Sequence, residues 1–346
     1  MSWVNKVIVS AIAGAAIMVG AVSLTSAYAQ EVKGPKVTWK FNVWGKKRAF
    51  TADVEAWSKH LAAKTGGNFK LKIYYGDQLG GKKQNLDNIK AGVFEASKVC
   101  WAYHAGKNQA MTVLNLPFLP MKSFEIQRRA SEAIHKHPIA AGEVAKKWNV
   151  MAFSTSNLPQ YEFLGRGRAP EKLENYKGMT VRALGGIAAA MRKLGSSIAT
   201  MTATEVYQAL DRGAADAVSF PSTYAHSAYK IDEVASWFTS NLSPGTNDCP
   251  NVISLTAWKK LPEQYKKLMY DAREKGYAAL KAAYSSKDKI NYPKWRKYMK
   301  EIKYTDTELT RFRKIGGQPV YDAWVAKHKD KFDAQALLDA VLAAAK

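Results

Sequence analysis

The feature that most constrains this chain is a regular alternation of strand-like and helix-like segments. Residues 37–44 alternate apolar and polar side chains with a period of two, residues 50–64 follow a helical pattern, and residues 69–75 alternate again. The same β-α-β order recurs after residue 150. This order is typical of a mostly parallel sheet with helices on both faces, so we expect an α/β protein with two doubly wound lobes.

Local signals indicate how the lobes are joined. Thr202 and Glu205 form the Thr-x-x-Glu pattern of a helix capping box, and Gly213 suits the end of the helix that follows. Beyond Leu261 the pattern is almost wholly helical, and we expect these helices to brace both lobes. No Pro/Gly-rich linker divides the chain, so we expect the lobes to be joined by strands or helices, as a hinge requires.

The first 29 residues predict export. Lys6 precedes an apolar run from Val7 to Leu24, and Ala27-Tyr28-Ala29 supplies an A-x-A cleavage site. We therefore expect a signal peptide over residues 1–29, cleaved to give a periplasmic chain that begins near Gln30. An uncleaved membrane anchor is the alternative, since the apolar run is nearly long enough to span a bilayer.

The charge of the chain favours an anionic partner. The formal net charge is +23, or about +22 once the single leader lysine is removed. Nucleic acid is not expected, because the basic residues are spread along the chain without a helix-turn-helix or RNA-binding signature and because an exported protein rarely meets nucleic acid. The charge is better explained as a solvated surface and a field that attracts small anions.

Sequence patterns for catalysis and for metal binding are absent. The chain has no GxSxG, Walker A or HExxH motif, and no GxGxxG motif opens a helix. His135 and His137 would lie about 200° apart on a helix, so they indicate a polar helix end rather than a metal site. We expect no enzyme, no metal and no cofactor; a secreted hydrolase or lyase with a tyrosine or histidine acid/base is the alternative.

The two cysteines, Cys100 and Cys249, are far apart in sequence. In an oxidising compartment they favour a disulfide, although the sequence leaves open whether their Cα atoms come within bonding distance. If they pair, we expect the bond near the rim of a cleft between the lobes, where it would steady two loops.

Several segments, taken in order, resemble the periplasmic substrate-binding proteins of TRAP transporters, of the DctP type. They are "YYGDQLGG" (74–81), "LPFLP" (116–120), "YKGMTVRALGG" (176–186), "TATEVYQALDRGAADAV" (202–218) and "ISLTAWKKLP" (253–262).

The resemblance implies a bilobal protein that closes on a ligand in its cleft, has a long helix spanning both lobes, and delivers the ligand to TRAP membrane permease subunits. We expect lobe I to comprise residues 30–156 and 248–287, and lobe II residues 157–247 and 288–346. A sensor subunit that presents its ligand to a membrane receptor is the alternative output. The chain is expected to be a monomer or a homodimer.

The resemblance also implies a role for Arg182, which ends a predicted strand just before two glycines. In the family the arginine of this motif pairs with the ligand carboxylate, and a guanidinium fork suits that geometry. The departures from the family pattern concern the ligand. No second arginine lies between Asn157 and Glu162, and Ser219 and Phe220 replace a glutamate and an asparagine. An apolar wall in place of an amide favours an aromatic or keto monocarboxylate over a sugar acid.

The remaining candidate ligand contacts are aromatic residues near predicted strand ends and polar residues near the hinge. Ligands of open α/β sheets bind at strand ends, where aromatic rings can enclose a planar group. The aromatic candidates are Trp44, Trp101, Tyr103, Tyr161, Phe220 and Tyr224, and the polar candidates are Asn157, Gln160, Ser222 and Asn247.

Overall fold

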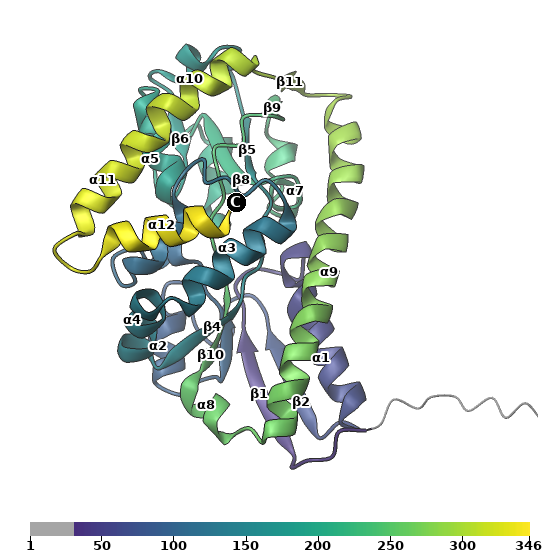
Figure 1. The fold of residues 1–346 in the computed structure, drawn as a ribbon. Coiled ribbons are helices and arrows are strands. Elements are labelled where there is room, and N and C mark those ends of the chain that lie inside the picture. Colours follow the sequence, from purple (N-terminus) through teal and green to yellow (C-terminus); the bar gives the residue numbers. More distant parts are fainter. Residues whose placement is uncertain (1–30) are drawn as a thin grey trace, which may run out of the picture. The chain divides into compact units, whose positions relative to one another are not determined.

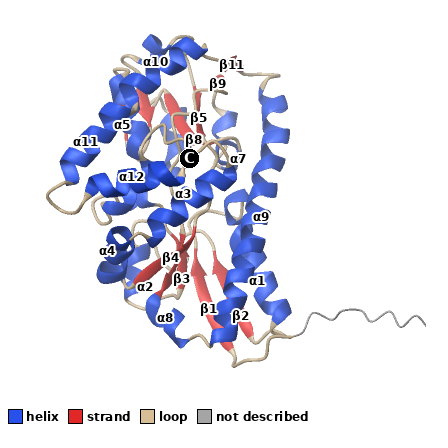
Figure 2. Cartoon of the chain, viewed as in Figure 1, coloured by secondary structure: helices blue, strands red, loops and turns tan. Residues whose placement is uncertain are grey.

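The computed structural model of the chain describes residues 31–346, and the predicted signal peptide therefore lies outside the described residues. The described residues form two β-sheets, each with its own helices (Figure 1; Figure 2). The prediction of an α/β fold with two lobes is confirmed. None of the helices within residues 31–346 is long and apolar enough to cross a membrane.

The first sheet belongs to lobe I and has the strand order β2-β1-β3-β10-β4. Trp39 and Phe41 of β1 point into the core, as the period-two pattern predicts. β1 runs parallel to β2 and β3, whereas β10 runs antiparallel to both of its neighbours. The strands are β1 (Val37–Asn42), β2 (Phe69–Tyr74), β3 (Ala96–Lys98), β4 (Val150–Ser154) and β10 (Asn251–Ser254). The helices of this part are α1 (Ala52–Lys64), α2 (Asn85–Lys90), α3 (Phe124–Lys136), α4 (Pro138–Trp148) and α8 (Leu255–Lys260).

The second sheet belongs to lobe II and has the order β11-β9-β5-β8-β6-β7. β6 runs parallel to β7 and β8, and β5 runs antiparallel to β8 and β9. The strands are β5 (Tyr161–Gly165), β6 (Thr180–Arg182), β7 (Ser197–Ala199), β8 (Ala217–Pro221), β9 (Trp237–Thr239) and β11 (Lys300–Ile302). The helices are α5 (Gly185–Lys193), α6 (Val206–Asp211) and α7 (Tyr224–Ala228). The capping box of Thr202 and Glu205 is confirmed: the Thr202 backbone N–H and hydroxyl both donate to the Glu205 carboxylate.

Two extended crossings join the lobes, one between β4 and β5 and the other between β9 and β10. They lie side by side, because the Tyr161 N–H donates to the Gly245 carbonyl at 2.8 Å and the Thr246 hydroxyl donates to the Leu158 carbonyl at 3.0 Å. β10 and β5 begin where these crossings end, and both run against their neighbours. This explains why the sheets are mixed and not mostly parallel.

The long helix α9 (Glu263–Trp295) spans both lobes, as the resemblance implies. Its 33 residues extend for about 50 Å. It packs on α1 of lobe I and on α7 of lobe II, and Figure 1 shows it running along one side of both sheets. Tyr265 near its start is buried in an apolar cluster of lobe I, and Trp295 at its end is buried in one of lobe II.

The C-terminal helices are divided between the lobes. α10 (Asp306–Gly316) contacts α5 of lobe II. α11 (Gln318–His328) and α12 (Ala334–Ala344) instead share a buried apolar cluster with Ile89, Val99 and Trp101 of lobe I. α11 also contacts α5 and α10 of lobe II, so these C-terminal helices pack against both lobes.

Candidate ligand-binding site

A small cavity of about 30 Å³ lies between the lobes, where strand ends of both sheets meet. Its walls come from the segments after β1 and β3 of lobe I and from the ends of β5 and β8 of lobe II. The lining residues are Trp44, Arg48, Phe50, Cys100, Tyr103 and Cys249 on the side of lobe I, and Leu158, Tyr161, Ala203, Phe220, Pro221, Tyr224, Ala225 and Tyr229 on the side of lobe II.

Larger hollows of about 350 to 460 Å³ open elsewhere on the described part of the chain, beside Trp39, Trp324, Arg128 and Arg166. None of these four is lined by a predicted ligand-binding residue, so the interlobe cavity is the candidate site.

Five of the six predicted aromatic residues line this cavity. The Trp44 and Tyr103 rings meet edge to face at 5.9 Å, and Phe220 stacks on Tyr229 at 5.4 Å. Tyr161 and Tyr224 complete the predicted set. Trp101 is the exception: it is fully buried in the apolar cluster of lobe I and does not line the cavity.

Arg182 lies behind the wall of the cavity and is almost completely buried. Its Nε and Nη2 groups donate to the Met201 carbonyl at 3.2 and 2.8 Å, and Nη1 donates to the Ser219 carbonyl at 2.9 Å. Its guanidinium carbon lies 4.7 Å from the centre of the Phe220 ring. Arg182 is thus covered by Phe220 and does not itself line the cavity.

The guanidinium of Arg182 retains donor capacity. An arginine side chain has five N–H bonds, and three of them are used by the two carbonyls. No carboxylate of residues 31–346 lies within ion-pair distance of it. Its charge also reaches the cavity wall: burial raises the pKa of Tyr161, while the Asn247 amide and the Arg182 charge oppose that rise.

The four predicted polar contacts have different surroundings. The Asn157 amide donates to the Phe124 carbonyl at 2.7 Å, and the Gln160 amide donates to the Met121 carbonyl at 3.4 Å. The Ser222 and Tyr292 hydroxyls share a hydrogen bond of 2.6 Å. Asn247 is different: its amide is buried next to Tyr161, and neither heteroatom of its side chain makes a hydrogen bond of good geometry within residues 31–346. Of the four, Asn247 has the most unused hydrogen-bonding capacity.

The sequence analysis missed Arg48, which lines the cavity from lobe I. Its Nη1 group donates to the Trp44 and Lys46 carbonyls at 2.8 and 2.7 Å. Its guanidinium carbon lies 4.8 Å from the centre of the Phe50 ring and 5.6 Å from that of Tyr229. A signal for it was present, because Arg48 follows the end of β1 by only a few residues, in the same loop as Trp44.

A buried ion pair supports this side of the cavity. The ammonium of Lys98, which is fully buried, lies 2.8 Å from the Asp53 carboxylate and donates to the Ser156 hydroxyl at 2.7 Å. It also lies 4.4 Å from the centre of the Phe50 ring, which lines the cavity. Burial lowers the pKa of Lys98, and the Asp53 carboxylate opposes that change.

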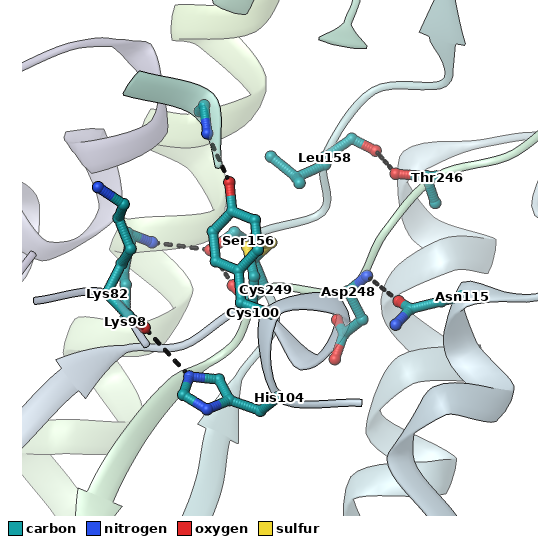
Figure 3. Close-up of a disulfide and its surroundings, with 12 residues drawn as sticks. Lys82, Lys98, Cys100, His104, Asn115, Ser156, Leu158, Thr246, Asp248 and Cys249 are labelled. Carbon is teal, nitrogen blue, oxygen red and sulfur yellow. Dashed lines mark hydrogen bonds between the residues drawn. A yellow bond between two sulfur atoms is a disulfide. The ribbon is translucent and has the colours of Figure 1, made fainter. Parts of the chain in front are cut away.

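The predicted disulfide between Cys100 and Cys249 is present, with the Cα atoms 3.9 Å apart. Both cysteines line the cavity, and Figure 3 shows the bond among the polar contacts of the crossings. The Ser156 hydroxyl donates to the Cys249 carbonyl at 2.5 Å, and the Asp248 N–H donates to the Asn115 side chain at 2.8 Å. The disulfide therefore fixes the loop after β3 to the crossing that enters β10.

His226 and His104 carry no positive charge near neutral pH. Burial lowers the pKa of His226, which packs on Phe220, to about 3, and that of His104 to about 4. His135 pairs with Asp248 at 2.7 Å and not with His137. Groups of three or more side chains that could hold a metal ion do not occur in residues 31–346. The charge beside the cavity therefore comes from arginine and lysine.

Comparison with known proteins shows which family and which solved structures this chain is similar to. The model of a family described as "Bacterial extracellular solute-binding protein, family 7" (DctP) matches residues 42–328. A monocarboxylate 2-oxoacid-binding periplasmic protein of Nostoc is 25% identical over 244 residues, which are 69% of this chain and 65% of that relative. The match thus spans slightly less than two thirds of that protein.

Solved structures share the fold at low sequence identity. A TRAP solute-binding protein of Rhodoferax ferrireducens, in complex with copurified benzoate, superposes with a TM-score of 0.76 at 20% identity, covering 89% of this chain and 97% of that one. A TRAP periplasmic solute-binding protein of Roseobacter denitrificans with bound β-D-glucuronate gives a TM-score of 0.72 at 18% identity, covering 89% and 99%. The shared fold therefore accompanies different bound ligands.

Proposed function

This chain belongs to the DctP family of bacterial extracellular solute-binding proteins, and we propose that it captures a small organic anion between its lobes and delivers it to the membrane permease of a TRAP-type transporter. The family is one of binding proteins and not of enzymes. Under this proposal the chain is exported by cleavage of residues 1–29 and acts in the periplasm. The lobes close about the two crossings, 155–160 and 240–250, with α9 as a brace.

The observation that carries the proposal is the state of Arg182. A buried cation is costly unless it is paired, yet the hydrogen bonds of this one go only to two carbonyls, and two N–H bonds stay free. A ligand carboxylate supplies the missing charge and accepts from the guanidinium fork. Because Phe220 covers Arg182, binding requires this ring to move aside as the anion enters, with Asn247 as the adjacent amide partner.

We further propose that the ligand is an aromatic or 2-oxo monocarboxylate. The walls are aromatic, and Phe220 stands where the family pattern that the chain resembles has an asparagine. Two of the similar proteins are named for such ligands, a 2-oxoacid in one case and benzoate in the other. A sugar acid needs more hydrogen-bonding groups than these walls present.

A thermal-shift screen of organic acids tests the proposal. An acid at 100 times its dissociation constant stabilises the native state by about 2.7 kcal/mol, which raises the melting temperature by several degrees. We expect 2-oxo and aromatic monocarboxylates to produce the largest shifts, and uronic acids to produce none.

The Arg182→Gln variant then assigns the site. Loss of one or two charge-assisted hydrogen bonds weakens binding by about 10- to 1000-fold or more. Arg168→Gln is the matched control, because Arg168 also lies in lobe II and donates to a backbone carbonyl, but is exposed. Equal affinity in the Arg182 variant and the control, with both folded by circular dichroism, would reject the assignment.

A further inference from the structure

We propose that Arg48 is a second ligand-contacting residue, supplied by lobe I, which binds a second acceptor oxygen of the anion whose carboxylate pairs with Arg182. The inference rests on the proposed function and adds a specificity determinant to the same site. It predicts that a ligand with a 2-oxo oxygen binds more tightly than the same acid without it.

The first argument is the way Arg48 is held. Both hydrogen bonds of its guanidinium use Nη1, which donates to the carbonyls of Trp44 and Lys46. These bonds fix the side chain within its own loop and leave the N–H groups of Nε and Nη2 without a partner in the part of the chain that the structure describes. The side chain is thus preorganised at the cavity wall with donors to spare.

The second argument is charge. Lys47, the next residue in the chain, lies 2.6 Å from the Glu55 carboxylate, and Lys98 is paired with Asp53. Neither Arg48 nor Arg182 has a carboxylate of residues 31–346 within ion-pair distance. Two guanidinium groups that no carboxylate of residues 31–346 neutralises therefore lie beside the cavity, Arg48 in its wall and Arg182 behind Phe220. An anion placed there is attracted by both of them.

The third argument is the position of the two groups on opposite lobes. Arg182 lies against Phe220, Phe220 stacks on Tyr229, and Tyr229 lies against Arg48 of lobe I. The pair of stacked rings thus connects the two guanidinium groups along one wall of the cavity. A ligand that accepts from both groups bridges the lobes, so its second acceptor stabilises the closed form in particular.

The test compares acids that differ only in the second acceptor. The pairs are pyruvate with propionate and phenylglyoxylate with phenylacetate, and their dissociation constants are measured by isothermal titration calorimetry. The wild-type chain is expected to bind the 2-oxo member of at least one pair about 10- to 100-fold more tightly, the range of one charge-assisted hydrogen bond. In Arg48→Gln this ratio should fall to near one, while the affinity for the plain acid changes little.

Lys47→Gln is the matched control, because it removes one positive charge from the same loop but not from the cavity wall. It should keep the wild-type ratio. If Arg48→Gln lowers the melting temperature of the ligand-free chain, Arg48→Lys is the second variant, because it retains the charge and the aliphatic stem. It should lower the preference for the 2-oxo acid by less than Arg48→Gln does.

The outcomes separate this inference from the proposed function. An unchanged ratio in both Arg48 variants, an equal weakening of both acids, or the absence of any 2-oxo preference in the wild type would overturn the role of Arg48. Undiminished binding of the plain acid by Arg182→Gln would instead overturn the proposed function, since that acid depends on Arg182 alone.

Discussion

Each lobe buries one long cationic side chain beside the interlobe cavity, and the two are neutralised differently. In lobe I, Lys98 pairs with Asp53, which also accepts from the Asn251 amide at 2.7 Å. In lobe II, Arg182 donates to two backbone carbonyls and has no carboxylate partner within residues 31–346. Both side chains are almost completely shielded from solvent.

This difference in partners distinguishes a charge that stabilises the fold from a charge that is available to bind an anion. A buried ion pair is complete in itself, and breaking it leaves an uncompensated charge in a medium of low polarity. A buried guanidinium with free N–H groups is incomplete, so it gains free energy from an anion that arrives later. By this criterion Lys98 maintains lobe I, whereas Arg182 fits the ligand-binding role proposed for it. Arg48 resembles Arg182 because it too has no carboxylate partner in the described chain.

The largest effect is expected from Asp53→Asn, which tests whether the ion pair of Lys98 stabilises the fold. Removing one partner of a buried ion pair should lower the free energy of unfolding by about 3–5 kcal/mol, measured by urea denaturation. The control, Asp87→Asn, removes an exposed pair with Lys107 and should cost less than about 1 kcal/mol. If Asp53→Asn reduced ligand affinity but not stability, the division between a structural and a functional cation would be wrong.

A smaller or equal effect is expected from the disulfide, which ties the loop after β3 to the crossing that enters β10. The bond closes a loop with a sequence separation of 149 residues. Replacing both Cys100 and Cys249 by serine should lower the free energy of unfolding by about 2–5 kcal/mol, because the unfolded chain gains entropy. Dithiothreitol should destabilise the wild type by a similar amount and leave the double variant unaffected. Equal sensitivity of both proteins to the reductant would contradict this role.

The smallest predicted effect concerns one buried histidine in each lobe. The folded-state pKa values, about 4 for His104 and about 3 for His226, lie below the ordinary value of 6.5. The unfolded chain therefore takes up these protons first as the pH falls. The stability contributed by the neutral rings is complete above pH 6.5 and is lost progressively towards pH 4 and pH 3.

Between about pH 6 and about pH 5, the free energy of unfolding of His226→Gln should fall by about 1 kcal/mol less than that of the wild type. Urea unfolding at the two pH values measures this difference. His104→Gln makes the same comparison for lobe I. A pH dependence identical to that of the wild type in both variants would show that neither ring is held neutral.

The sequence predicted much of the site because strand ends converge in an α/β lobe. Trp44, just after the end of β1, and Phe220, near the end of β8, line the cavity as this rule predicts. Trp101 follows a strand end as well, but its ring turns into the core of lobe I. Asn157 lies in the hinge as expected, but its amide serves the Phe124 carbonyl. A strand end fixes the position of a residue, whereas the direction of its side chain depends on what packs around it.

The sequence by itself determined most of the elements, the α/β fold and the position of Arg182 at a strand end, because hydrophobic periodicity and turn residues act over a few positions. Only the tertiary structure decided which charges are paired. It brought Asp53 to Lys98, packed α11 and α12 against the apolar cluster of lobe I, and left Arg48 in the cavity wall and Arg182 behind it without carboxylate partners in the described chain. The physical reason is that neutralisation of a charged side chain depends on distances of a few ångströms to residues far away in the chain. A local sequence pattern does not predict these distances.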